Sequence, residues 1–257
     1  MSGRIVVGID GSGPSSAALT WAIARASATD LPLHLVHVVE PGADETAASH
    51  LLETTVAAAG ARMPRLTVTH QLLRGPAARG LAEAATPHDL LVLGTHKTGY
   101  LSGRVLGTRG LVVASAAACS VVIVPDATPA SRRGILVGVG AHDPSHTAAL
   151  AGAREAARLH EDLTLIRATD GDPVDGRALL ADAAAAVVPL ADGLEVRSRL
   201  SRRRPAEALL DASRSASLLV IGAPSDETAA TRHLGSVSYE VLLNINTAVM
   251  IAREDTP

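Results

Sequence analysis

Short apolar runs alternate with longer alanine-rich or amphipathic segments along the first half of the chain. The apolar runs are typical of buried strands and cover residues 4–9, 33–39, 66–72, 90–93 and 120–124. The segments between them predict helices at residues 17–28, 43–62, 76–85 and 108–118. Pro14 suits the first turn of the first helix, and Ser12 is placed to cap it. Regular strand–helix alternation predicts a parallel sheet with helices on both faces.

The second half repeats the same order of elements. Its strands are expected near residues 134–139, 163–168, 194–200, 217–221 and 247–252, and its helices near 145–160, 175–188, 205–214 and 236–245. The sequences themselves correspond: residues 5–9 (IVVGI) match residues 135–139 (ILVGV), and residues 89–94 (DLLVLG) match residues 217–222 (SLLVIG). A period of about 128 to 130 residues indicates two copies of one domain, because the repeats of a solenoid are several-fold shorter.

The chain is therefore predicted to be an α/β protein of two tandem, doubly wound, Rossmann-like domains, each with a five-stranded parallel sheet flanked by helices. We expect the first domain at residues 1–125, a short polar linker at 126–133 and the second domain at 134–257. Doubly wound sheets bind ligands at the carboxyl ends of their strands, where the strand order reverses. Candidate chemistry is therefore expected in the loops that follow the first and fourth strands.

Composition narrows the class of protein further. The chain has no Phe, one Trp and two Tyr, so the cores must be built from aliphatic side chains. Its net charge of −3, with basic and acidic residues interspersed, predicts no binding of nucleic acid or of an anionic membrane. The single cysteine, Cys119, excludes an intrachain disulfide, and no apolar run is long enough to span a membrane. The chain starts without a signal-peptide pattern, so we expect a soluble, cytoplasmic protein.

The loop after the first strand carries an aspartate among glycines and serines, residues 8–13 (GIDGSG). It is not a dinucleotide-binding fingerprint, because Asp10 stands where the second glycine would be needed. In a ligand-binding role, Asp10 could accept a hydrogen bond from a sugar hydroxyl or a base. In a structural role, it could form an Asx turn or cap the following helix, and the residues taken alone favour this structural role.

The loop after the fourth strand, residues 94–108, contains four glycines and ends where a helix begins. Backbone N–H groups at a helix N-terminus form an anion site when side chains do not obstruct it. Thr108 adds a hydroxyl, and Lys97 and Arg109 can add positive charge. The alternative is a flexible crossover loop, but the second half retains the spacing at Gly222 and 235–236, which favours the anion site.

Together these motifs resemble the universal stress protein family over nearly the whole chain, as two tandem copies. The resemblance rests on residues 7–12 (VGIDGS), on residues 75–77 (GPA), on the pattern G-x2-G-x9-G-[ST] from Gly94, and on residues 234–238 (LGSVS) followed by a helix and 247–251 (TAVMI). Members of this family have a five-stranded parallel α/β sheet, and some members bind ATP while others do not.

Carried over by position, the resemblance implies an adenine-nucleotide site in the first domain. It would place Asp10 on the adenosine part of the nucleotide and the Val38 backbone against the adenine. The ribose and phosphates would be held by Gly94, Gly107 and Thr108. The sequence departs from the family pattern at Lys97, which stands in place of the second glycine of the motif. A lysine there could pair with a phosphate or fill the space that the phosphate needs, and both readings stay open.

The second copy departs further from the pattern. Gly140 replaces the aspartate, Pro224 removes a backbone donor, and Asp226 and Glu227 put negative charge where phosphates would lie. We therefore expect the second domain to hold a degenerate site and to act as a structural partner of the first.

Three functions follow from these observations. The preferred one is a cytoplasmic, non-catalytic module of the stress response that binds an adenine nucleotide, ATP with magnesium, in the first domain; we also expect a homodimer and an unidentified protein partner. The alternatives are a nucleotide-free scaffold that acts by protein contacts and, more weakly, a slow ATP hydrolase. No metal site is expected: His34 and His37 point to opposite faces of a strand, and His142 and His146 lack a third ligand. No catalytic triad is recognisable either.

Overall fold

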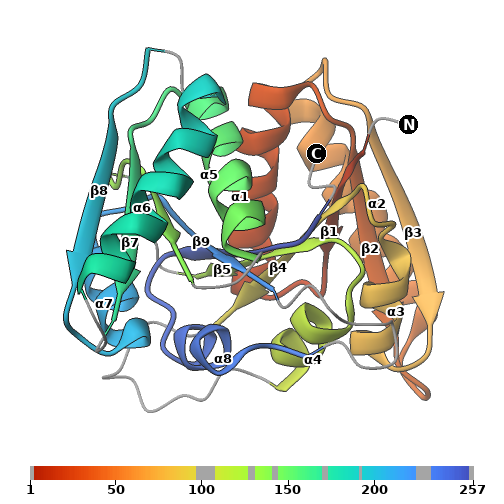
Figure 1. Ribbon diagram of the computed structural model, residues 1–257. Coiled ribbons are helices and arrows are strands. Elements are labelled where there is room, and N and C mark those ends of the chain that lie inside the picture. Colours follow the sequence, from red (N-terminus) through yellow and green to blue (C-terminus); the bar gives the residue numbers. More distant parts are fainter. Residues whose placement is uncertain are drawn as a thin grey trace. The chain divides into compact units, whose positions relative to one another are not determined.

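The fold was analysed in a computed structural model of the chain, which describes residues 3–96, 108–126, 131–140, 144–169, 173–190, 193–223 and 233–254. These residues separate into two compact units, one within residues 3–126 and one within residues 131–254. Each unit is a parallel α/β domain, as the alternation of apolar runs and helical segments predicts (Figure 1). They are called the first and second domains below.

The first domain contains five parallel strands in the order β3-β2-β1-β4-β5. The strands are β1 (Ile5–Gly8), β2 (Leu33–Val39), β3 (Val68–Arg74), β4 (Leu90–Thr95) and β5 (Ser120–Pro125). The helices are α1 (Gly13–Thr29), α2 (Glu45–Arg62), α3 (Ala77–Ala84) and α4 (Thr108–Ala116). Strand order reverses between β1 and β4, so this is the point at which a ligand site is expected.

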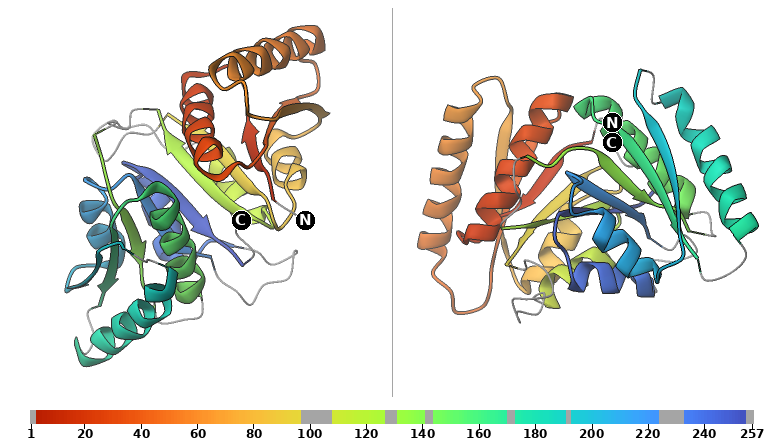
Figure 2. Two further views of the ribbon diagram at one scale, coloured as in Figure 1. Left: turned by 90° about the horizontal axis from the view of Figure 1, so that it is seen from above. Right: turned by 90° about the vertical axis from the view of Figure 1, so that its left-hand side faces the viewer.

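Two helices cover each face of this sheet. α1 contacts β1 and β4, and α2 contacts β2 and β3, while α3 packs against α4 on the other face (Figures 1 and 2). The predicted helix start is confirmed at α1: Pro14 lies in the first turn, and the Ser12 hydroxyl accepts a hydrogen bond from the backbone N–H of Ser15 at 3.3 Å. Strand β4 is almost wholly buried, as its continuous apolar sequence predicts.

The second domain repeats this plan with the strand order β10-β9-β6-β7-β8. Its strands are β6 (Ile135–Gly138), β7 (Leu163–Ala168), β8 (Val196–Ser201), β9 (Leu218–Gly222) and β10 (Ala248–Ala252). Its helices are α5 (Pro144–Leu159), α6 (Pro173–Val187), α7 (Pro205–Ala212) and α8 (Ser236–Leu243), with a short 3-10 turn η1 (Val188–Leu190) after α6.

The predicted boundaries of the two outermost strands were shifted by one or two residues. The third strand of each copy was expected at residues 66–72 and 194–200, whereas β3 covers Val68–Arg74 and β8 covers Val196–Ser201. Both strands have mostly exposed or half-buried side chains, so their hydrophobic pattern carries little information about where they begin and end.

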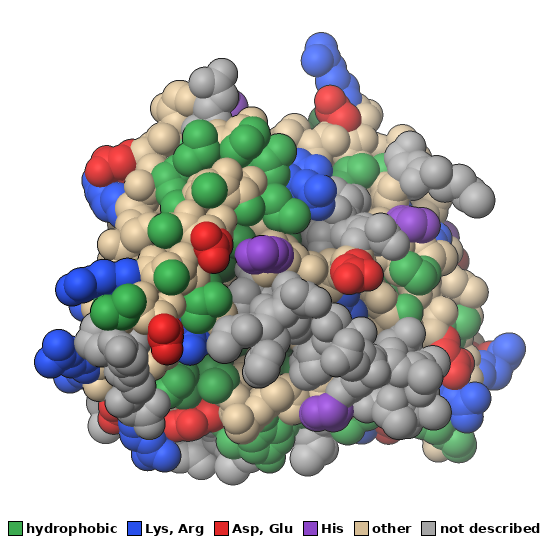
Figure 3. Space-filling view, in the orientation of Figure 1, with side chains coloured by type: hydrophobic (Ala, Val, Ile, Leu, Met, Phe, Trp, Pro, Cys, Tyr) green, Lys and Arg blue, Asp and Glu red, His purple; other side chains and the backbone are tan. Residues whose placement is uncertain are grey.

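One face of the molecule is mixed in charge (Figure 3). On the face drawn in Figure 3, the described Lys and Arg side chains are interspersed with Asp and Glu side chains rather than gathered in a basic stripe. Within the part of the chain that the structure describes, no helix is both long and apolar enough to cross a membrane.

Candidate functional site

A cavity of about 820 Å³ lies in the first domain at the carboxyl ends of β1, β2 and β4. It therefore lies at the strand-order reversal between β1 and β4, where the sequence predicts a site. Its described lining includes three of the predicted site residues, Asp10, Val38 and Gly94. Lys97 and Gly107 lie outside the described residues. Thr108 is the first residue of α4, and only its backbone is described.

Asp10 lines this cavity and also shapes the loop that contains it. Its Oδ1 accepts a hydrogen bond from the backbone N–H of Ser12 at 2.9 Å, which forms an Asx turn just before α1. Burial would raise the pKa of Asp10, but hydrogen bonds from Ser12 outweigh that effect and hold the pKa below its ordinary value. The carboxylate is therefore ionised at neutral pH, and it occupies both positions proposed for it from the sequence, in the turn and at the cavity.

His37, which the sequence analysis did not place in a site, lines the same cavity. Its Nδ1 lies 2.5 Å from the carbonyl oxygen of Ile9, and since a carbonyl only accepts, the imidazole must donate from Nδ1. This bond ties the end of β2 to the residue after β1, directly beside Asp10. Its position near the end of a predicted strand, next to Val38, could have indicated that His37 lies at the site. Nothing in the sequence indicates that it bonds to Ile9.

The second domain has an equivalent hydrogen bond, which is made by a different type of side chain. Arg167 of β7 donates from Nη1 to the carbonyl oxygen of Val139 at 3.2 Å, and these two residues correspond to His37 and Ile9. Gly140 then stands where Asp10 stands in the first domain. The second copy thus retains the bond between strand ends and lacks the carboxylate.

Gly94 has a steric role that is separate from any ligand. A Cβ atom at this position would lie 2.1 Å from the backbone oxygen of Pro14 and 2.7 Å from the backbone nitrogen of Ser15. The first turn of α1 thus packs directly on the backbone of β4, at the floor of the cavity, and only glycine permits this approach.

Val38 is 9% exposed and lines the cavity between β2 and α3. A Cβ built on Gly80 of α3 would come within 3.1 Å of its two methyl groups, so α3 lies close against this residue. The predicted contact of the Val38 backbone with adenine stays a prediction.

Two described basic side chains at the cavity, Arg109 and His96, each lie beside an acidic side chain. Arg109, in the first turn of α4, places Nη2 at 3.0 and 3.1 Å from the two carboxylate oxygens of Glu40, which follows β2. His96 Nδ1 lies 3.5 Å from Asp126 Oδ2, an ion pair when the imidazole is protonated. The sequence predicts that Arg109 adds positive charge to the site. In the structure this charge is paired with Glu40, which belongs to none of the recognised motifs.

The glycine–serine motif of the second domain also uses its polar groups internally. Gly235 is the N-cap of α8, and the buried Ser238 hydroxyl donates to the carbonyl oxygen of Gly222 at 3.5 Å. Pro224, Ser225, Asp226 and Glu227 lie outside the described residues, so the expected degeneracy of this site stays a prediction.

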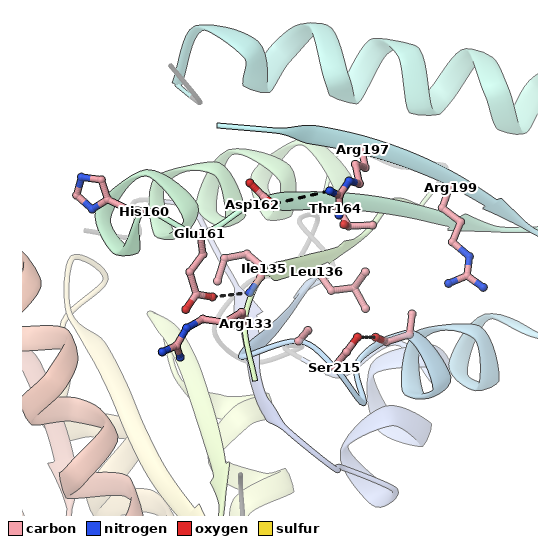
Figure 4. Close-up of a pocket in the computed structure, with 13 residues that line it drawn as sticks. Arg133, Ile135, Leu136, His160, Glu161, Asp162, Thr164, Arg197, Arg199 and Ser215 are labelled. Carbon is pink, nitrogen blue, oxygen red and sulfur yellow. Dashed lines mark hydrogen bonds and ion pairs between the residues drawn. The ribbon is translucent and has the colours of Figure 1, made fainter. Parts of the chain in front are cut away.

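A second cavity, of about 490 Å³, lies at the amino ends of β6 and β7 in the second domain (Figure 4). In the first domain the corresponding place holds the buried His34, which hydrogen-bonds Thr69 and Gln71 at 2.9 and 3.3 Å. In the second, the smaller Thr164 lies beside Arg197, and Arg197 pairs with Glu195 and Asp162. Because this cavity opens at the edge of the sheet opposite to that used by doubly wound folds, no function is assigned to it.

Among the described residues, no three His, Cys, Asp or Glu side chains gather so that they could hold a metal ion. His34 and His37 illustrate the reason, since each ring is engaged with different partners on different sides of β2.

Comparison with known proteins identifies the family. The sequence pattern of the Universal stress protein family matches residues 1–125 and again residues 131–253, so the chain belongs to this family and carries two tandem copies of its domain. It is similar over 97% of its length to a universal stress protein of Mycolicibacterium smegmatis (29% identity, 96% of that protein covered) and to one of Mycobacterium tuberculosis (27% identity, 96% covered).

A solved structure of a universal stress protein from Archaeoglobus fulgidus has the same fold. It is similar to this chain with a TM-score of 0.79 at 16% identity, over 98% of this chain and 99% of that one. The predicted family and fold class are therefore confirmed.

Proposed function

We propose that the first domain binds an adenine nucleotide, with ATP and its magnesium among the ligands, and that the protein acts in the stress response without catalysing a reaction. The observation that carries this proposal is the cavity at the β1/β4 reversal, which is large enough for a nucleotide. An ionised carboxylate, Asp10, lies at one side of it and the start of α4 at another.

The chemistry of the lining supports binding more than catalysis. The described polar groups nearest the strand ends are engaged in holding the loop: Asp10 accepts from Ser12, and His37 donates to Ile9. A general base for hydrolysis would need to activate a water molecule instead. A non-catalytic role, a cytoplasmic location and a homodimer are parts of the same proposal, and cell fractionation and light scattering would test the last two.

Thermal unfolding with and without ligand tests the binding. A ligand that binds only the folded state at a hundredfold excess over its Kd stabilises by about 2.7 kcal/mol, which gives a measurable rise in Tm. We expect such a rise with ATP and magnesium in the native protein and its loss in Asp10→Ala.

Asp44→Ala is the matched control for this test. Asp44 also accepts backbone N–H bonds at a helix start, from Thr46 at 2.8 Å, but it does not line the cavity. It should lower the basal Tm and keep the ligand-induced rise. An unchanged Tm of the native protein with millimolar ATP, AMP and adenosine, and no nucleotide released on denaturing the purified protein, would reject nucleotide binding and favour the scaffold.

A further inference from the structure

The ion pair of Glu40 and Arg109 joins two sides of the candidate nucleotide cavity. Glu40 follows β2 and Arg109 lies in the first turn of α4, and both line the cavity. The pair is formed by two hydrogen bonds from Nη2, at 3.0 and 3.1 Å. The side chains are 47% and 69% exposed, so the pair lies at the solvent-exposed rim, where a ligand would enter or extend.

The charges on the described lining of this cavity do not favour a polyphosphate. Among the described lining residues, two carry carboxylates, Asp10 and Glu40, and one carries a guanidinium, Arg109. That guanidinium is paired with one of the two carboxylates. A phosphate oxyanion uses the same N–H donors as a carboxylate, so it would have to compete with Glu40 for them.

We infer that Glu40 determines ligand specificity at this site: by holding Arg109, it makes the cavity favour adenine ligands with few phosphates over triphosphates. The inference rests on the proposed function, because it concerns which adenine ligand the same cavity prefers. Its physical basis is twofold. Glu40 withdraws the guanidinium from the ligand, and its own negative charge repels each phosphate brought to the rim.

The exposure of the pair makes the inference testable without loss of the fold. Exposed ion pairs contribute little to folding because water and salt screen them, so variants of Glu40 and Arg109 should fold and keep the native Tm to within a few degrees. The same screening limits the effect on binding to about two- to tenfold in Kd.

The experiment measures by calorimetry the Kd of adenosine, AMP and ATP, at one magnesium concentration, for the native protein and Glu40→Gln. The amide keeps the size of the side chain and removes its charge. We expect ATP to bind about two- to tenfold more tightly to the variant, AMP to gain less, and adenosine to change by less than about twofold. Raising the salt concentration should shrink the gain for ATP.

Two further variants test whether the effect belongs to the pair of Glu40 and Arg109 or to any change in surface charge. Glu83→Gln removes the same charge from another exposed ion pair of the first domain, with Arg79 at 2.8 Å, outside the cavity, and should leave all three affinities unchanged. Arg109→Gln should weaken ATP binding. In the Arg109→Gln background, the gain from Glu40→Gln should be smaller than in the native protein, because the residue that Glu40 restrains is gone.

The outcomes distinguish this inference from the proposed function. Equal Kd values of ATP for native protein and Glu40→Gln, an equal loss of all three ligands, or an equal gain in both backgrounds would overturn the role of Glu40 while leaving nucleotide binding in place. If the native protein binds none of the three compounds, the proposed function fails, and the inference about which of them the cavity prefers fails with it.

Discussion

The backbone oxygen of Pro14 lies so close to Gly94 that a Cβ atom at Gly94 would be only 2.1 Å from it. Both atoms belong to backbone, so neither a rotamer change nor a flexible side chain can relieve the contact. The first turn of α1 and the carboxyl end of β4 thus fix each other's position, and with them the floor of the candidate site.

We predict that Gly94→Ala destabilises the first domain by about 3 kcal/mol or more, since overpacking against backbone costs at least as much as overpacking a core. Trp21, the single tryptophan, lies in α1, so its fluorescence during urea unfolding reports on this domain. An alanine variant as stable as the native protein would show that α1 can move away from β4.

Gly60→Ala is the matched control, with an effect of opposite sign. Gly60 lies inside α2, and a Cβ there meets nothing within 4 Å. Alanine should stabilise the domain by about 0.4–1 kcal/mol, because it reduces the freedom of the unfolded chain. Loss of stability in this variant would mean that helix propensity does not govern the position.

Asp89 should make the first domain sensitive to acid. Burial would raise the pKa of its carboxyl, but hydrogen bonds from Thr86 and Arg4 outweigh burial and lower the pKa from the ordinary 3.8. Because the folded state binds the proton less readily than the unfolded state, the stabilisation is present above about pH 3.8 and is lost as pH falls through the folded pKa.

We therefore expect the unfolding free energy of the first domain to fall below about pH 4, and Asp89→Asn to flatten that part of the pH profile. At neutral pH the variant should be less stable by about 1–3 kcal/mol, since the amide cannot accept from Thr86 and Arg4 as the carboxylate does. Unfolding curves followed by Trp21 fluorescence between pH 3 and 7 test both points; parallel profiles for the two proteins would contradict them.

Nucleotide binding should depend on the glycine–hydroxyl motif of the first domain and not on that of the second. Gly107→Val should abolish the ATP-dependent rise in Tm, whereas Gly235→Val should leave it intact. A Cβ at Gly235 meets nothing within 4 Å, so the position has open space for the first atom of a side chain. A rise that is reduced but not abolished in each variant would instead indicate a ligand in both domains.

Lys97 gives two opposite predictions for one titration. If its ammonium pairs with a phosphate, Lys97→Ala should weaken ATP binding more than adenosine binding, and salt should reduce the difference. If its side chain fills the phosphate position, Lys97→Gly should tighten ATP binding, because glycine lets backbone amides approach the anion. We favour the phosphate contact, and tighter binding of ATP by Lys97→Gly would show that choice to be wrong.

The sequence predicted the strands and helices because their hydrophobic periods are strong. It indicated the loops after the first and fourth strands as the candidate site because doubly wound sheets bind ligands at the carboxyl ends of their strands, and ligand binding there stays a prediction. It did not reveal why Gly94 must be glycine, since that depends on how closely a helix approaches a strand. The partners of His37 and Arg109 were also hidden, because Ile9 and Glu40 lie 28 and 69 residues away along the chain. A motif predicts which residue types lie near a site. It does not predict their hydrogen-bond and ion-pair partners, which come from distant parts of the chain.

A hydrogen bond joins the second strand to the residue after the first strand in both domains, from His37 in the first and from Arg167 in the second. Holding the loop in place is therefore separate from providing it with a carboxylate. Both copies still bond the second strand to the residue that follows the first, although one uses an imidazole and the other a guanidinium. Only the first copy has a carboxylate in the next position, Asp10, where the second has Gly140. The second domain therefore provides an internal control: its loop is held by the equivalent hydrogen bond but lacks the carboxylate. Comparing the two loops shows what the carboxylate of Asp10 contributes.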